Sequence, residues 1–446
     1  MKISTLEEIV DSALNELRIA GVDNSSVLVS NSTEKKIRFS NNTITISKEI
    51  DIIFLSIYAS KDGKRIIGST SNLFGKPLKF FINSLVDSCI SLHPSKDYIS
   101  PPSGPFKYSH NCNLDNKIRD GEIDMVGVVK QAIDSGLKAK AERVSGSLSS
   151  HYSNRIIRTS KGIEAHDQST GININLRAFT DDNASGHGLS CSPTLDDFNG
   201  EEAGRIAGEY AKRSLKPKMI KDGIYDLVLT PTVAADIIQN VGLSASAFSV
   251  EMNTSFLTKK IGKEIATEDF TLTDYGIVNG GLEGRIFDDE GVPTQKTTII
   301  DNGILENYLH NTTTAKKFKT NTTGNAGMIS PKPWNLVVSA GSFTSNELIS
   351  EVKRGLFITN NWYTRFQNLS SGEYSTVPRD AAFLIEDGEI KEPVAGIRIS
   401  DSIPRQLLNI SGISKDRKWI EWWEVEIPTL SPYILLKNVP ITRAIG

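Results

Sequence analysis

Cysteine is scarce in this sequence, and the few cysteines limit where the protein can work. The 446 residues include three of them, Cys89, Cys112 and Cys191. Their number is odd and they stand far apart, which argues against a disulfide framework and favours a reducing compartment. We therefore expect a cytoplasmic protein.

Long apolar runs and an excess of charge are missing as well. No apolar run reaches the roughly 18 residues that a membrane-spanning helix needs, and residues 1–10 lack the apolar core of a signal peptide. The formal net charge is −3, and basic residues never form a long run. The sequence therefore gives no electrostatic support for binding nucleic acid, and no sign of a membrane partner.

Familiar catalytic motifs are also absent. The sequence has no Gly-x-Ser-x-Gly elbow and no phosphate-binding P-loop. No two histidines stand three or four residues apart, as they do on the helix of an HExxH zinc site. Three histidines could converge in space, but strand histidines that satisfy a backbone group are commoner; the three are His151, His166 and His187.

Two further clusters favour structural interpretations. The run Asp288-Asp289-Glu290 carries three carboxylates, but its spacing is not that of an EF-hand, so we predict a solvated turn. Trp419, Trp422 and Trp423 lie close together without an accompanying basic surface. We expect them in a core or an interface rather than in a platform for stacking bases.

The length and the pattern of elements predict an α+β fold with two domains. A chain of 446 residues is too long for one hydrophobic core. We place an N-terminal domain of antiparallel sheet and helices at 1–220, and a sheet-rich C-terminal domain at 221–446. A Lys-Pro-Lys break at 216–218 and a turn at 222–223 mark the boundary. Residues 1–95 and 120–215 share a rough helix, meander, helix order, which suggests an internal repeat.

Apolar periodicity and turn residues predict the individual elements. Helices are expected over 6–17, 74–91, 123–136, 199–215, 232–248 and 345–355. A strand, a turn and a second strand are expected over 141–162. Single strands are expected over 26–30, 36–47 (with a turn at 41–42), 50–60, 65–69, 170–180, 225–229, 297–300, 304–309, 334–340, 356–359, 381–386, 389–394, 422–427 and 434–438.

The stretch 284–327 carries the strongest local signals. Asn302-Gly303 between two apolar runs predicts a hairpin with a type I′ turn, in which both central residues have positive φ. A loop with little side-chain bulk follows, so that an extended peptide could approach its backbone closely. The candidate residues for a peptide groove are Thr323, Gly324, Asn325, Ala326 and Gly327.

Several short motifs, in their order and spacing, resemble one family over nearly the whole chain. They lie at 37–42, 62–72, 159–162, 196–215, 287–294 (FDDEGVPT), 323–326 (TGNA), 354–359 (RGLFIT) and 385–390 (IEDGEI). Together they resemble the TldD/PmbA family, also called TldD/TldE. The resemblance implies a cytoplasmic protein that acts in proteolysis of unfolded or modified peptides, with an α+β N-terminal domain and a β-rich C-terminal domain.

The resemblance also implies a division of labour between two related subunits. The TldD-type subunit carries zinc on an HExxxH helix and a later cysteine, whereas the PmbA/TldE-type subunit lacks that site. At the matching positions this chain has Gln239, Asn240 and Ser244, and no cysteine follows Cys191. The resemblance therefore implies a PmbA/TldE-like chain with no catalytic residues, no metal site and no cofactor of its own.

Two hypotheses about function remain open at this point. The first is a non-catalytic subunit that pairs with a zinc-bearing TldD-like chain, or with itself when purified alone. The second is a protein that binds peptides by itself without cutting them. A third role, modulation of a DNA topoisomerase, has no support from the charge of −3.

Overall fold

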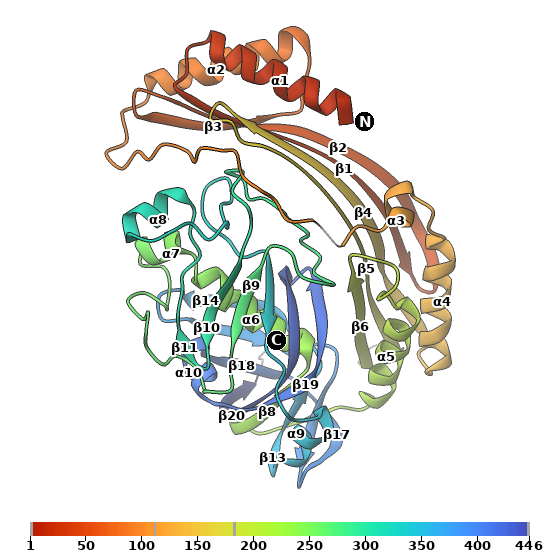
Figure 1. The fold of residues 1–446 in the computed structure, drawn as a ribbon. Helices are drawn as coiled ribbons and strands as arrows, with labels where there is room; N and C mark the ends of the chain where they lie inside the picture. The colour runs from red at the N-terminus through yellow and green to blue at the C-terminus, as the bar shows by residue number, and fades with distance from the viewer. Residues whose placement is uncertain (1–2, 111–112, 182–183, 444–446) are drawn as a thin grey trace.

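Two β-sheets with helices around them organise the chain, so the predicted α+β class is confirmed. The structure is a computed structural model and describes residues 3–110, 113–181 and 184–443. Figure 1 shows the N-terminal sheet arching over the rest of the chain. Division into two independently folding domains near residue 220 stays a prediction.

The N-terminal sheet is antiparallel, six-stranded and ordered β3-β2-β1-β4-β5-β6. Its strands are β1 (Asn24–Ser40), β2 (Thr43–Lys61), β3 (Lys64–Thr70), β4 (Arg143–Thr159), β5 (Glu164–Asp181) and β6 (Ala184–Ser192). The helices of this half are α1 (Ile3–Ile19), α2 (Gly75–Ser91), α3 (Asn116–Asp120), α4 (Met125–Lys138) and α5 (Gly200–Arg213).

The internal repeat suggested by the sequence is visible in the order of these elements. A helix, three strands and a helix occur once as α1 to α2, and again from α4 to α5. The first strands of the two repeats, β1 and β4, pair antiparallel at the centre of the sheet. The two repeats therefore build one continuous sheet.

The strands are longer than the sequence indicated. Residues 26–30 and 36–40 belong to one strand, β1, and 141–162 contains the single strand β4 where we expected a strand, a turn and a strand. Both are paired on each side along most of their length. Polar stretches such as Ser149–Asn154 stay extended because neighbouring strands hold their backbone groups.

One face of this sheet carries all four long helices. Odd-numbered residues of β1 point to that face: Val27 and Val29 pack against α1 and α2, and Ile37 and Phe39 pack with α4 and α5. Because side chains alternate along a strand, even-numbered residues such as Leu28 point to the opposite face. Figure 1 shows this second face turned toward the C-terminal half.

The C-terminal sheet is mixed and 14-stranded. Its strands are β7 (Lys218–Met219), β8 (Gly223–Leu229), β9 (Leu272–Tyr275), β10 (Lys296–Asp301), β11 (Ile304–Leu305), β12 (Asn335–Val338), β13 (Arg354–Ile358), β14 (Trp362–Asn368), β15 (Glu373–Val377), β16 (Ala382–Glu386), β17 (Glu389–Ala395), β18 (Ile397–Ser402), β19 (Ile410–Trp422) and β20 (Val425–Arg443). Strand β20 pairs with β8, β12, β18 and β19, so it is the hub of this sheet.

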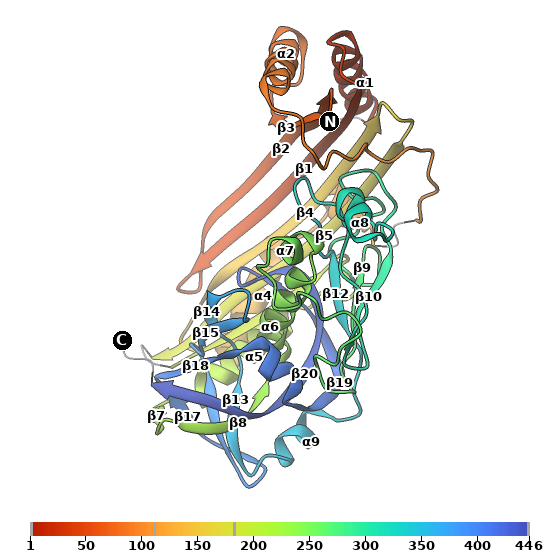
Figure 2. The ribbon, with the colours of Figure 1, turned by 90° about the vertical axis from the view of Figure 1, so that its left-hand side faces the viewer.

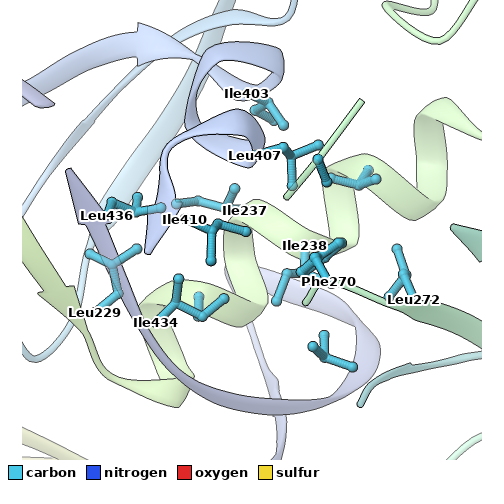
Figure 3. Packing of buried hydrophobic residues seen from close by; sticks show 14 of the residues in the cluster. Leu229, Ile237, Ile238, Phe270, Leu272, Ile403, Leu407, Ile410, Ile434 and Leu436 are labelled. Carbon is cyan, nitrogen blue, oxygen red and sulfur yellow. The ribbon is translucent and has the colours of Figure 1, made fainter. Parts of the chain in front are cut away.

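The helices of the second half are short, except one. They are α6 (Pro231–Ser244), α7 (Ala247–Glu251), α8 (Thr312–Phe318), α9 (Ser345–Ser350) and α10 (Ile403–Leu408). The helix expected over 232–248 is therefore two helices. Helix α6 lies in the largest apolar core, where Ile237 and Ile238 pack among Phe270, Leu407 and Ile434 (Figure 3). Most of its residues are apolar, as expected for a helix that is largely buried.

Turn chemistry was the most reliable signal in the sequence. Asn302 and Gly303 have φ of 45° and 81° between β10 and β11, so the predicted type I′ hairpin is confirmed. The turn at Asn41-Asn42 also has two positive φ values, of 48° and 66°. The strand expected over 422–427 is wrong, because a turn at 423–424 joins β19 to β20 there.

Direct contacts join the two sheets. Leu28 of β1 packs with Phe287 of the second half. Asn173 of β5 donates to the carbonyl oxygen of Glu421 at 2.6 Å, and Arg177 forms an ion pair with buried Asp380. Among the helices of the described residues, none combines the length and apolarity needed to cross a bilayer.

Candidate functional site

Helix α6 carries the positions at which the sequence placed a degenerate zinc motif. It starts at Pro231, whose fixed φ suits the first helical position, directly after β8. Gln239 lies on this helix with only 6% of its surface exposed. Its side-chain nitrogen donates to the carbonyl oxygen of Glu424, and its side-chain oxygen accepts from the nitrogen of Glu426 at 2.9 Å. The side chain therefore fastens the β19–β20 hairpin to α6.

A buried carboxylate lies one turn before Gln239. Asp236 is 1% exposed and accepts from Gln239 at 3.0 Å, and from the side chains of Asn361 and Thr364. Burial raises the pKa of Asp236 to about 6, against these hydrogen bonds, which lower it. Asp236 thus ties α6 to the start of β14. No sequence motif marks Asp236, because it stands as an isolated Asp within a mostly apolar helix.

The other two positions of the degenerate motif also contact the chain itself. The side chain of Asn240 donates to the carbonyl oxygen of Asp236 at 2.7 Å. The carbonyl oxygen of Ser244 accepts from the hydroxyl of Ser255 at 2.6 Å. Amides and hydroxyls at these positions can donate and accept hydrogen bonds, but they lack the imidazole and thiolate groups that zinc prefers.

The three histidines that could have converged on a metal lie on three different strands, β4, β5 and β6. His166 contacts Asn154 at 2.6 Å, and His187 contacts Asn175 at 3.0 Å, each through Nε2 to an amide oxygen on the neighbouring strand. His151 lies opposite Gly171 on β5. Burial lowers the pKa of all three. Over residues 3–110, 113–181 and 184–443, no group of three or more His, Cys, Asp or Glu is arranged to hold a metal ion.

The cysteines that the structure describes are free and buried. They are Cys89 and Cys191; Cys112 lies outside the described residues. The thiol of Cys191 donates to the carbonyl oxygen of Trp419 at 3.2 Å. Burial raises the pKa of Cys191, so its reactive thiolate is disfavoured.

The β19–β20 hairpin brings aromatic rings together at the sheet interface. Trp422 is buried and its ring centroid lies 4.6 Å from that of His187 on β6. Trp423, at the turn, is 56% exposed and lies 4.8 Å from Trp362 of β14. Trp422 therefore lies in an interface, one of the two locations predicted for the tryptophans, whereas the prediction is wrong for Trp423, which is mostly exposed.

The candidate peptide loop is mostly turned inward. Gly324, Asn325 and Ala326 are buried, and the nitrogen of Ala326 donates to Asp288 at 3.0 Å. The carbonyl oxygen of Gly324 accepts from the indole of Trp334 at 2.9 Å. Thr323 is half-buried. Gly327 lines a cavity of about 320 Å³, together with Phe248, Met328, Glu290 and the tip of β3. A peptide groove here stays a prediction, and Gly327 is the member of the candidate set that lines this cavity.

The predicted solvated turn at Asp288-Asp289-Glu290 is wrong. Asp288 is fully buried and accepts hydrogen bonds from the main-chain nitrogens of Glu290, Val292 and Ala326 at 2.9–3.0 Å. Burial, followed by the nearby Glu290, raises the pKa of Asp288 well above its usual range. This carboxylate organises the loop around it by accepting backbone donors that would otherwise be buried without partners.

Two family models match most of this chain. The PmbA/TldA metallopeptidase central domain matches residues 119–215, and the PmbA/TldA metallopeptidase C-terminal domain matches residues 222–443. The chain belongs to the PmbA/TldD metallopeptidase family. The membership predicted by the motifs is thereby confirmed.

Individual relatives agree with this assignment. A metalloprotease of Methanocaldococcus jannaschii is 31% identical over 216 residues, which are 46% of this chain and 47% of the relative. Metalloprotease PmbA of Escherichia coli O157:H7 is 26% identical over 67% of this chain and 65% of the relative. The chain thus spans about half the length of the first curated relative that it matches.

One solved structure superposes over nearly the whole chain. It is a Thermotoga maritima protein described as a proposed modulator of a DNA gyrase. The match has a TM-score of 0.88 with 25% identity, and covers 98% of this chain and 100% of the other.

Proposed function

We propose that this chain is the PmbA/TldE-like subunit of a cytoplasmic metallopeptidase pair. It takes part in cutting unfolded or modified peptides but holds no catalytic zinc and carries no catalytic residue. The zinc belongs to a TldD-like partner subunit. The matches to the curated relatives cover 47% and 65% of their length. The substrate and the partner of this chain are therefore proposed.

The contacts of Gln239 carry the proposal. A zinc ligand must direct a lone pair at the metal, and a catalytic zinc usually has three protein ligands. The oxygen of Gln239 accepts from Glu426, and its nitrogen donates to Glu424 and Asp236. The position is therefore occupied by a structural contact between α6 and the β19–β20 hairpin. An amide also cannot replace the general base, because it has no proton-accepting pKa near neutrality.

A subunit without chemistry acts through contact with a subunit that has it. We therefore propose a heterodimer with a TldD-like chain, and a homodimer when the chain is purified alone. The partner supplies the zinc, and this chain helps to bind and orient the peptide.

The experiment compares three samples: this chain, a TldD-like chain from the same organism, and their mixture. Each is assayed for zinc by elemental analysis, for mass by light scattering, and for digestion of unfolded casein with and without a chelator. We expect a complex in the mixture, chelator-sensitive digestion by the mixture, and no digestion by this chain alone.

Two results would overturn the proposal. Stoichiometric zinc with chelator-sensitive digestion by this chain alone would make it a catalytic subunit. A monomer both alone and in the mixture, with no change in digestion, would remove the partnership and leave a peptide-binding protein that acts alone.

A further inference from the structure

An open groove lies between the N-terminal sheet and the second half of the chain. It has a volume of about 760 Å³ and is formed on the sheet side by β1, β4 and β5, and on the other side by Trp362 and Trp423. Arg38, Ser147 and Asn175 are successive register partners across those three strands. They therefore share one face, which is opposite the face that packs against the helices. We call this the arginine groove, defined by its lining residues Arg38, Arg177, Phe179, Trp362 and Trp423, together with Arg379, which stacks on Trp362.

Stacked arginines and aromatic rings line this groove. The Arg177 guanidinium lies 4.9 Å from the ring of Phe179 and 5.4 Å from that of Trp362. The Arg379 guanidinium also lies near Trp362, 5.0 Å from the centre of its ring. A stacked guanidinium keeps its N–H groups at the edge of the plane, where a carboxylate can accept two of them.

The charge of the groove is only partly neutralised within the chain. Arg177 is paired with buried Asp380. Arg38 and Arg379 are both exposed, and within the part of the chain that the structure describes neither has a carboxylate within 4 Å. The groove therefore offers one solvent-facing cation in its lining, Arg38, and a second, Arg379, stacked on its Trp362 wall.

The aromatic wall is held rigidly, which suits a binding surface. The nitrogen of Tyr363 donates to the carboxylate of Glu424 at 2.9 Å, so β14 is tied to the β19–β20 turn. Tyr363 has a φ of 58°, a strained value for a non-glycine residue that persists only when its surroundings enforce it. Gln239 holds the same turn from α6. The interactions that fill the degenerate motif thus also position Trp423 over the groove.

We propose that the arginine groove binds an extended peptide that carries acidic side chains next to apolar ones. The acidic groups pair with Arg38 and Arg379, and the apolar groups lie on Trp362 and Trp423. The proposal rests on the proposed role in peptide processing and adds to it a substrate class and a binding site on this subunit. A single-stranded nucleic acid fits less well, because the carboxylates of Asp380 and Glu424 lie beside the same aromatic wall and the chain is acidic overall.

The test measures binding to the purified chain by calorimetry. The probe is an end-blocked decapeptide that alternates glutamate with leucine. The control peptide has the same length, with glutamine in place of every glutamate. We expect the acidic peptide to bind about tenfold tighter, the difference that one or two charge-assisted hydrogen bonds make. High salt should remove most of this difference, because the two arginines are exposed.

Variants locate the site. The double variant Arg38→Gln and Arg379→Gln should lose the preference for the acidic peptide, and Trp423→Ala should weaken both peptides. Arg18→Gln is the matched control, because Arg18 is an exposed arginine on α1, away from the groove. All of these side chains are exposed, so the variants are expected to keep the thermal stability of the parent.

Three outcomes would overturn the proposal: equal affinity for the two peptides, an unchanged preference in the double variant, or tighter binding of a single-stranded oligothymidylate than of the acidic peptide. A double variant that changes only the oligomeric state would assign the groove to a contact between copies of the chain. The peptide assay uses this chain alone, whereas the test of the proposed function uses a mixture with a TldD-like chain. Failure of one proposal can therefore be told apart from failure of the other.

Discussion

The side-chain oxygen of Gln239 accepts a hydrogen bond of 2.9 Å from the main-chain nitrogen of Glu426, which lies 187 residues further along the chain. The other end of the same amide donates to the carbonyl oxygen of Glu424. One side chain therefore satisfies two backbone groups of the β19–β20 hairpin at once.

Gln239→Ala should destabilise the protein by about 1–3 kcal/mol, because it removes two part-buried hydrogen bonds to the hairpin and one to buried Asp236. Urea unfolding measures the change. The matched control is Gln131→Ala, on the exposed side of α4, which should change stability by less than about 0.5 kcal/mol. Equal stability of the two variants would show that the hairpin does not depend on Gln239.

Restoring the motif residues should not create an enzyme. The triple variant Gln239→His, Asn240→Glu and Ser244→His regains three side chains of the HExxxH pattern, but no cysteine follows Cys191 in the sequence. It also breaks the contacts that Gln239 makes with the hairpin. We expect substoichiometric zinc by elemental analysis and no casein digestion. Chelator-sensitive digestion by the triple variant would contradict this expectation.

Stability should depend on pH through Asp274. Burial raises the pKa of this carboxyl to about 7, against hydrogen bonds from Asn325 and the nitrogen of Trp334, which lower it. The folded state then binds a proton that the unfolded state releases, so this stabilisation is present at low pH and is lost as the pH rises through about 7.

The measurement compares unfolding free energies of the parent and Asp274→Asn at pH 6 and pH 8. From pH 6 to 8 the parent should lose about 1 kcal/mol more than the variant. Buried His187 and His310, whose pKa values burial lowers to about 4, act in the opposite direction in both proteins, so they cancel in the comparison. A difference of the opposite sign would refute the assignment.

Gly324→Val should destabilise the fold rather than act only on peptide processing. Gly324 has a φ of 68°, and an added Cβ would collide with the carbonyl oxygen of Pro293. The cost is expected to be about 2 kcal/mol or more. Gly223→Val is the control, because a Cβ there meets only Tyr225, at 3.6 Å. An unchanged melting temperature with slower processing would instead place the loop in contact with the peptide.

The parts of the fold prediction that were confirmed rested on turn residues, whose conformational preferences are local. The turns at Asn41-Asn42 and Asn302-Gly303 were readable because two consecutive positive φ values restrict the residues that fit. The long strand β4 was not readable, since its polar residues Ser149–Asn154 look like a turn until strands on both sides pair with them. Sequence patterns report local preference, and here pairing over long distances decided the structure.

The site was predicted less completely than the fold. The family motifs pointed to Gln239, but its hydrogen bonds to a hairpin 187 residues away have no local signature. Asp288 looked solvated because acidic runs usually are, yet three backbone nitrogens converge on its carboxylate. The arginine groove joins residues from both ends of the chain, so no sequence window contains it.

Strand β20 also has a consequence for how the protein is made. It is the last strand described, yet it pairs with β8, β12, β18 and β19, and so it joins the interior of the C-terminal sheet. During synthesis the earlier strands leave the ribosome before the strand that links them exists. The N-terminal sheet can close once β6 has emerged, whereas the second half must wait for residues 425–443 and stays open to chaperones and proteases until then.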